Sequence, residues 1–195
     1  MASSRLLAIL VVVLALAAAG CGGGGDSETT TEAEPPPATT TLPSQVSHDA
    51  PELEALLPAS IGATKLQKGS ATGADVFGGD AFSREMTRRL IAAGKAPVDL
   101  RFANTQDPKG KIELELGVFE VPGMSSTALR RAIVAASRPN APGLTAEAGT
   151  LGGKPITAVV YPAGTILYLY EQGGRVFYVG SQNQALATRA IGLLP

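Results

Sequence analysis

Apolar side chains follow three successive patterns along the 195 residues of this sequence. Residues 6–19 form an unbroken apolar run behind a single charge, Arg5. Residues 22–45 then contain almost no large apolar side chain except Leu42, so they cannot offset the entropy cost of ordering. From residue 49 onward, apolar positions recur at helical and strand spacing. The predicted parts are an export signal over residues 1–20, a disordered tether over 21–48 and one folded domain over 49–195.

Within the domain, apolar residues at helical spacing predict four helices. The first begins at Asp49 and ends before Pro58, and the second covers about Ala81 to Ala93 behind an acidic cap. The third begins at Ser125, whose hydroxyl group can cap the first turn. The fourth follows residues 181–184, where Ser, Gln, Asn and Gln form a capping box.

Alternating apolar and polar residues predict strands between the helices. From Lys111 to Leu116 the alternation places apolar residues on one face and Glu113 and Glu115 on the other, and Val118 keeps the apolar phase. One buried face and one solvated face are typical of an antiparallel sheet. Further strands are predicted at Val98–Phe102, Ile156–Tyr161, Ile166–Tyr170 and Val176–Val179, with hairpin turns at Asp107–Gly110 and Gly173–Gly174.

The predicted elements follow the order helix, strand, helix, two strands, helix, an optional strand, three strands and helix. Strands that pair with near neighbours, with helices between the groups, indicate the α+β class. We therefore expect an antiparallel sheet of about five to six strands, packed by about four helices, after the tether.

A short internal repeat relates two of these strand-and-helix units. Val118-Phe119-x-Val121 and the later Arg131-Ala132-Ile133 match Val176-Phe177-x-Val179 and Arg189-Ala190-Ile191, at a constant offset of 58 positions. An old duplication would produce this match, and so would one packing solution used twice. The sequence leaves both explanations open.

The N-terminal segment indicates export and a lipid anchor. A basic start, a short apolar core and small residues before the cleavage point are typical of a secretory signal. The segment Leu16-Ala17-Ala18-Ala19-Gly20-Cys21 resembles the lipobox of bacterial lipoproteins, with Ala18 where leucine is usual. This resemblance implies cleavage before Cys21, the only cysteine, and attachment of lipid to its thiol. The alternative is ordinary signal cleavage after Ala19, with Cys21 incidental.

Charge divides at the boundary between tether and domain. Residues 22–50 carry five acidic residues and no Lys or Arg, whereas residues 51–195 carry 15 basic and 12 acidic residues. This small basic excess does not indicate a nucleic-acid partner, and we expect none. The threonine and proline content of the tether is also typical of glycosylated stalks.

The sequence offers few residues for catalysis or metal binding. His48 is the only histidine and falls in the predicted tether, where it would lack the neighbours that position a base or a ligand. With one histidine and one cysteine, zinc sites and Ser-His or Cys-His nucleophiles are excluded. The glycine-rich segment 69–79 lacks the lysine-hydroxyl ending of a phosphate-binding loop, so we interpret it as a surface loop. We expect no cofactor and no metal.

Two kinds of residue remain as candidates for function. A carboxylate pair of the kind found in glycosidases could involve Asp75, Asp80 or Asp99, although Asp80 is better explained as a helix cap. Aromatic residues also gather on the C-terminal strands, where they could form a binding surface or simply pack across strands. The aromatic candidates are Tyr161, Tyr168, Tyr170, Phe177 and Tyr178.

The whole chain resembles the small uncharacterised membrane lipoproteins of actinobacterial type. The resemblance rests on Leu16–Cys21, the Gly/Thr/Pro tether, the Pro51–Pro58 opening and the final hairpin and helix ending at Pro195. In architecture alone, the domain is distantly similar to PsbP-like lipoproteins. The resemblance implies a location on the outer face of the cell membrane, and we expect a non-catalytic module that binds a protein or cell-wall partner. The alternatives are a carboxylate-dependent hydrolase and a carrier of small molecules or lipids.

Overall fold

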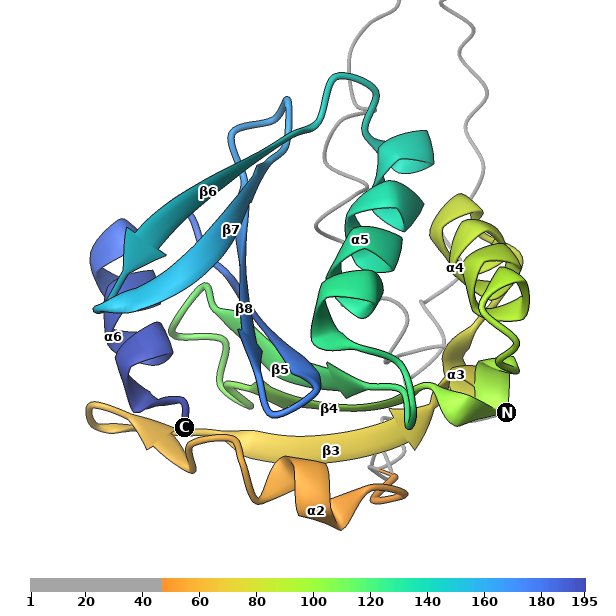
Figure 1. The fold of residues 1–195 in the computed structure, drawn as a ribbon. Coiled ribbons are helices and arrows are strands. Elements are labelled where there is room, and N and C mark those ends of the chain that lie inside the picture. The colour runs from red at the N-terminus through yellow and green to blue at the C-terminus, as the bar shows by residue number, and fades with distance from the viewer. Residues whose placement is uncertain (1–46) are drawn as a thin grey trace, which may run out of the picture.

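The computed structural model describes residues 47–195, which form an α+β structure around one large antiparallel sheet (Figure 1). The predicted signal, the lipobox with Cys21 and the tether up to residue 46 lie outside the described residues. The strand order across the sheet is β3-β4-β5-β9-β8-β7-β6, and every pair is antiparallel. The strands are β3 (Gln67–Thr72), β4 (Arg101–Gln106), β5 (Glu115–Glu120), β6 (Thr145–Leu151), β7 (Lys154–Val160), β8 (Ile166–Gln172) and β9 (Arg175–Gly180).

Helices cover both faces of this sheet. On one face, here the α4/α5 face, α4 and α5 pack against Phe119 and Val121 of the strand β5 and the loop after it. On the opposite α2/α6 face, α2 and α6 pack against Leu116 and Val118. The helices are α2 (Pro51–Glu54), α3 (Gly73–Val76), α4 (Ala81–Ala92), α5 (Ser126–Ser137) and α6 (Gln184–Leu193), with short 3₁₀ turns at η1 (Pro97–Asp99) and η2 (Arg138–Asn140).

The predicted helix caps are largely confirmed. The side chains of Asp80 and Ser125 accept hydrogen bonds from the third residue of α4 and α5, respectively. In α6 the cap is Asn183, and Ser181 supports it by accepting a hydrogen bond from the Asn183 backbone N–H. Asp49 does not cap α2, because its carboxylate accepts a hydrogen bond from Ser47 instead.

The sheet contains more strands than the sequence predicted. The segment 69–79, interpreted as a loop, supplies part of the strand β3 and the helix α3. The optional strand exists as β6, and a separate two-stranded sheet joins β1 (Ser60–Ile61) to β2 (Thr64–Lys65). Val98 belongs to η1 rather than to a strand, because Pro97 and the hydrogen bond from the Ala96 N–H to Asp99 hold a turn there.

The internal repeat corresponds to β5 with α5 and to β9 with α6. The two strands are antiparallel neighbours, and their helices lie on opposite faces of the sheet. When β5 is viewed along its direction with α5 above the sheet, β4 lies to one side of β5. When β9 is viewed in the same way with α6 above the sheet, β8 lies to the opposite side of β9. The units β4-β5-α5 and β8-β9-α6 therefore have opposite hand. In both units of the repeat, the Phe and the second Val face the helix that follows.

The two outer edges of the sheet differ in how they are covered. At β3, the Ser70 N–H donates to the Ser47 carbonyl at 2.9 Å, and the Ala50 N–H donates to the Ser70 hydroxyl at 2.8 Å. At β6, all six residues from Thr145 to Thr150 are exposed. Within residues 47–195, no segment pairs with the outer side of β6.

Candidate functional site

The aromatic residues that the sequence singled out are buried and divided between the two faces. Tyr161 and Tyr178 belong to the core on the α4/α5 face, and Tyr168, Tyr170 and Phe177 belong to the core on the α2/α6 face. None of the five exposes more than 9% of its surface. Tyr170 and Phe177 contact each other with ring centroids 5.9 Å apart. Cross-strand packing, the alternative given above, accounts for these positions, and the five do not form one exposed surface.

Glu115 is the exceptional acidic residue of the domain. It opens β5 opposite Gly180, and the alternation of the strand places it on the same face as Gly117 and Phe119. That face is covered by α5, so Glu115 is largely buried instead of lying on a solvated face as predicted. Burial raises the pKa of its carboxyl group to about 7.

Gly117 allows an aromatic ring to lie directly over the strand next to Glu115. Gly117 pairs with Tyr178 across β5 and β9. A Cβ atom at position 117 would stand 2.6 Å from Cζ of Tyr178 and 2.5 Å from the carbonyl oxygen of Ala103. The ring of Tyr178 fills this space and stacks on Phe119 with centroids 5.1 Å apart. Aromatic residues commonly cover glycine in this way in antiparallel sheets.

Tyr161 and Ser137 complete this group, which we call the Glu115 cluster (Glu115, Ser137, Tyr161 and Tyr178). Burial raises the pKa of the Tyr161 hydroxyl group, a hydrogen bond with Ser137 opposes this, and the charge of Glu115 raises the pKa further. Burial likewise raises the pKa of Tyr178, and Glu115 adds to the effect. Both tyrosines are therefore neutral hydroxyl groups near a carboxyl group that titrates around neutrality.

Glu115 differs from the other acidic residues of the interior in lacking a basic partner. Glu120 pairs with Arg175 at 3.0 Å and with Arg101, which also contacts Glu52 at 2.7 Å. None of the ion pairs formed among the described residues includes Glu115. An acidic residue that is buried without a counter-charge is a candidate for a functional role.

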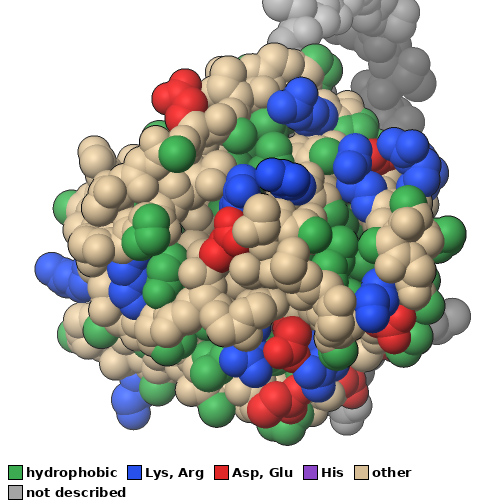
Figure 2. Space-filling view, in the orientation of Figure 1, with side chains coloured by type: hydrophobic (Ala, Val, Ile, Leu, Met, Phe, Trp, Pro, Cys, Tyr) green, Lys and Arg blue, Asp and Glu red, His purple; other side chains and the backbone are tan. Residues whose placement is uncertain are grey.

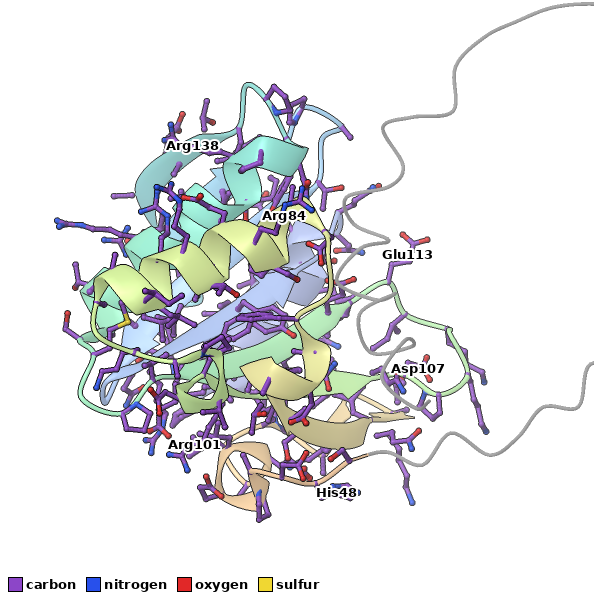
Figure 3. The ribbon with its side chains drawn as sticks, turned by 90° about the vertical axis from the view of Figure 1, so that its right-hand side faces the viewer. His48, Arg84, Arg101, Asp107, Glu113 and Arg138 are labelled. Atoms are coloured by element: carbon purple, nitrogen blue, oxygen red, sulfur yellow. The ribbon has the colours of Figure 1, made fainter. Side chains whose placement is uncertain are left out.

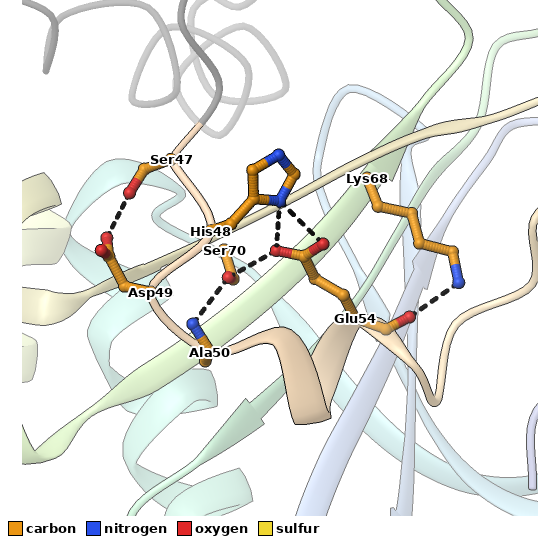
Figure 4. A network of polar contacts seen from close by, with 7 residues as sticks. All are labelled: Ser47, His48, Asp49, Ala50, Glu54, Lys68 and Ser70. Atoms are coloured by element: carbon orange, nitrogen blue, oxygen red, sulfur yellow. Dashed lines mark hydrogen bonds and ion pairs between the residues drawn. The ribbon is translucent and has the colours of Figure 1, made fainter.

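A second polar group surrounds His48 at the start of the domain (Figure 4). Nδ1 of His48 lies 2.9 Å from both carboxylate oxygens of Glu54, and the Ser70 hydroxyl donates to the same carboxylate at 2.6 Å. His48 is thus attached to the domain through a bridge to β3 and does not belong to a loose tether. Serine, carboxylate and histidine meet here, but Ser70 is completely buried and donates to the carboxylate. The histidine therefore cannot act as its base, and the group is structural.

The aspartates considered for a carboxylate pair bind their own turns. Asp75 accepts a hydrogen bond from the Thr72 N–H at 3.1 Å, Asp80 from the Ser83 N–H at 3.0 Å and Asp99 from the Ala96 N–H at 2.7 Å. Glu113 is exposed on the segment before β5 and projects away from the sheet (Figure 3). Among the acidic residues that the structure describes, Glu115 is therefore the one that is at least partly buried and takes part in no cap, turn or ion pair.

The surface gives no stronger indication of a site. Basic and acidic side chains lie in small separate groups on the face shown in Figure 2. In the part of the chain that the structure describes, no group of three His, Cys, Asp or Glu residues is arranged to hold a metal ion. No helix in residues 47–195 has the length and apolar character needed to cross a membrane. Comparisons with family models, curated proteins and solved structures found no match.

Proposed function

We propose that this chain is a membrane-anchored extracytoplasmic lipoprotein whose domain acts as a non-catalytic binding module. In this proposal the lipid is attached to Cys21, and the residues before 47 connect the anchor to the domain. Support for the anchor comes from the lipobox-like sequence and from the single cysteine of the chain. The resemblance to small lipoproteins of actinobacterial type supports the same location.

Glu115 is the observation that carries the binding role. A buried carboxylate without a partner is unfavourable, and a positively charged group placed beside it would remove most of that cost. Glu115 retains partial exposure, so a group from outside can reach it. We therefore propose that the Glu115 cluster receives an ammonium or guanidinium group of a protein or cell-wall partner.

This role follows from the chemistry of the cluster. A carboxylate whose charge acts on two neutral tyrosine hydroxyl groups accepts hydrogen bonds from an ammonium group and offers none of the paired acids of a glycosidase. Binding should require the ionised carboxylate, and should therefore strengthen as the pH rises through about 7, the pKa of Glu115.

The binding role is tested with butylammonium as the probe and butan-1-ol as its uncharged counterpart. The purified full chain, with its glutamate carboxyl carbons labelled with ¹³C, is titrated with each compound by NMR at pH 5 and pH 8. We expect butylammonium to shift the Glu115 resonance at pH 8, with a much weaker effect at pH 5 and none from butan-1-ol. If butylammonium instead shifts the resonances of other glutamates, and shifts them equally in the wild type and in the Glu115→Gln variant, the amine binds elsewhere and the proposal is refuted.

The anchor is tested independently by metabolic labelling. Radioactive palmitate should label the wild-type chain and not the Cys21→Ser variant. Equal labelling of both chains, or labelling of neither, would rule out lipid attachment at Cys21.

A further inference from the structure

The outer edge of β6 carries an unusual combination of exposure and composition. Residues 145–150 read Thr-Ala-Glu-Ala-Gly-Thr, with small side chains and a single charge at Glu147. All six are exposed, and the strand lies at the outside of the sheet (Figure 1). Exposed edge strands are usually protected by lysine, proline, a bulge or a covering segment. At the opposite edge, residues 47–57 cover β3, so the contrast lies within one sheet.

The hairpin between β6 and β7 determines which backbone groups of β6 face outward. Leu151 pairs with Lys154 across a two-residue turn, Gly152-Gly153, in which both residues have positive φ. Such a turn makes the pair that flanks it, Leu151 and Lys154, a hydrogen-bonded pair. Non-hydrogen-bonded and hydrogen-bonded pairs then alternate along β6 and β7, away from the turn. The residues whose N–H and C=O groups point away from β7 are therefore Ala146, Ala148 and Thr150.

These outward groups are arranged so that β6 can pair with itself. If two copies meet antiparallel with Ala148 opposite Ala148, Ala146 falls opposite Thr150, and every outward group gains a partner. On the α2/α6 side, the carboxylate of Glu147 then lies opposite Gly149, which has no side chain to obstruct it. Direct opposition of like charges, which would destabilise a strand pair, does not occur in this register.

We propose that β6 pairs with β6 of a second copy of this chain, antiparallel and centred on Ala148, so that two sheets become one continuous sheet. One strand pair buries less surface than the roughly 800 Å² per partner of a standard interface, so pairing in dilute solution is weak. Confinement to a membrane raises the effective concentration of the two copies and strengthens the pairing. This last point rests on the proposed anchor, which palmitate labelling tests separately.

The register is tested by crosslinking of the full chain in membranes with a short thiol-specific reagent. Opposite Cβ atoms in a strand pair lie about 5 Å apart. Ala148→Cys should therefore crosslink to itself. The Ala146→Cys and Thr150→Cys chains should crosslink when expressed together and not when expressed alone. The wild-type chain, with Cys21 alone, controls for crosslinking through that residue. A crosslink from Ala148→Cys to a different protein, or equal yields in all combinations, would overturn the proposal.

A proline substitution separates loss of pairing from loss of folding. The Ala148 N–H points away from β7, so Ala148→Pro removes a hydrogen bond of the proposed pair and none within the domain. We expect Ala148→Pro to abolish the crosslink between the Ala146→Cys and Thr150→Cys chains while leaving the circular dichroism spectrum and thermal midpoint unchanged. Ala148→Ser, which keeps the N–H, should retain the crosslink. A crosslink that persists with proline in a folded chain refutes backbone pairing at β6.

Discussion

Replacing Glu115 by glutamine should stabilise the domain at high pH. The pKa of Glu115 rises from its ordinary value of 4.5 to about 7 in the folded chain, with burial as the cause. Because the folded state holds the proton more tightly than the unfolded state, the stabilising contribution of protonated Glu115 is fully present below pH 4.5. This contribution is lost as the pH rises through about 7. Each pKa unit corresponds to about 1.4 kcal/mol, so the loss amounts to about 3 kcal/mol.

Glutamine keeps the shape of the protonated side chain and cannot ionise. The free energy of unfolding of Glu115→Gln should therefore lack this pH dependence, matching wild type near pH 4 and exceeding it by about 3 kcal/mol at pH 8. Urea denaturation at intervals between these two pH values measures both curves. Glu113→Gln provides the control, because Glu113 is an exposed carboxylate two residues away.

The refuting result is a pH dependence that Glu115→Gln shares with wild type. Parallel curves would mean that Glu115 ionises in the folded domain at no cost, and the argument for a cationic ligand would fail with it. If Glu113→Gln alone flattened the curve, the exposed carboxylate would be responsible instead. A stability gain from removing a residue is a frequent sign that the residue serves binding or catalysis.

Two further substitutions test the contacts described above. Gly117→Ala should destabilise the domain by about 2 kcal/mol or more, because its Cβ would overlap the ring of Tyr178 and the carbonyl oxygen of Ala103. Urea denaturation measures this loss, and a change below about 0.5 kcal/mol would show that the ring moves freely. Ser70→Ala should lower the free energy of unfolding by about 1–3 kcal/mol, because it removes a buried donor to Glu54 and an acceptor of the Ala50 N–H. An unchanged denaturation midpoint would show that the His48 network contributes nothing to stability.

The sequence was informative wherever one element could be recognised from its own residues. The caps of α4 and α5 and the strands β7, β8 and β9 follow from local patterns and agree with the structure. A strand between the first two helices was predicted without bounds, where β3 lies, and β6 was left optional, because Gln67–Thr72 and Thr145–Thr150 contain no large apolar residue. β6 is almost wholly exposed, and β3 buries only small side chains, so neither sequence carries the apolar signal on which prediction depends.

The position of Glu115 depended on a contact between distant segments. The predicted strand from Lys111 was wrong over residues 111–114, since β5 begins at Glu115, but alternation correctly placed Glu115 on the other face of the strand from Leu116. That other face is also buried, because α5 and Tyr178 cover it. One signal was available: Phe119 and Val121 continue the phase of Glu115 and are apolar, which indicates a second buried face. The His48 network gave no such signal, since Glu54 and Ser70 meet it only after folding.

The attachment of residues 47–50 to β3 determines where mechanical load would enter the domain. A pull on the chain before residue 47 is transmitted first to the backbone bonds with Ser70 and to the contact between His48 and Glu54. These contacts lie on the outermost strand of one edge, so separation would begin where residues 47–50 leave β3, while β9, β8, β7 and β6 stay together. Seven strands spaced about 4.8 Å apart place the loaded edge nearly 30 Å from the free one. Strain at the attachment point would therefore reach β6 last.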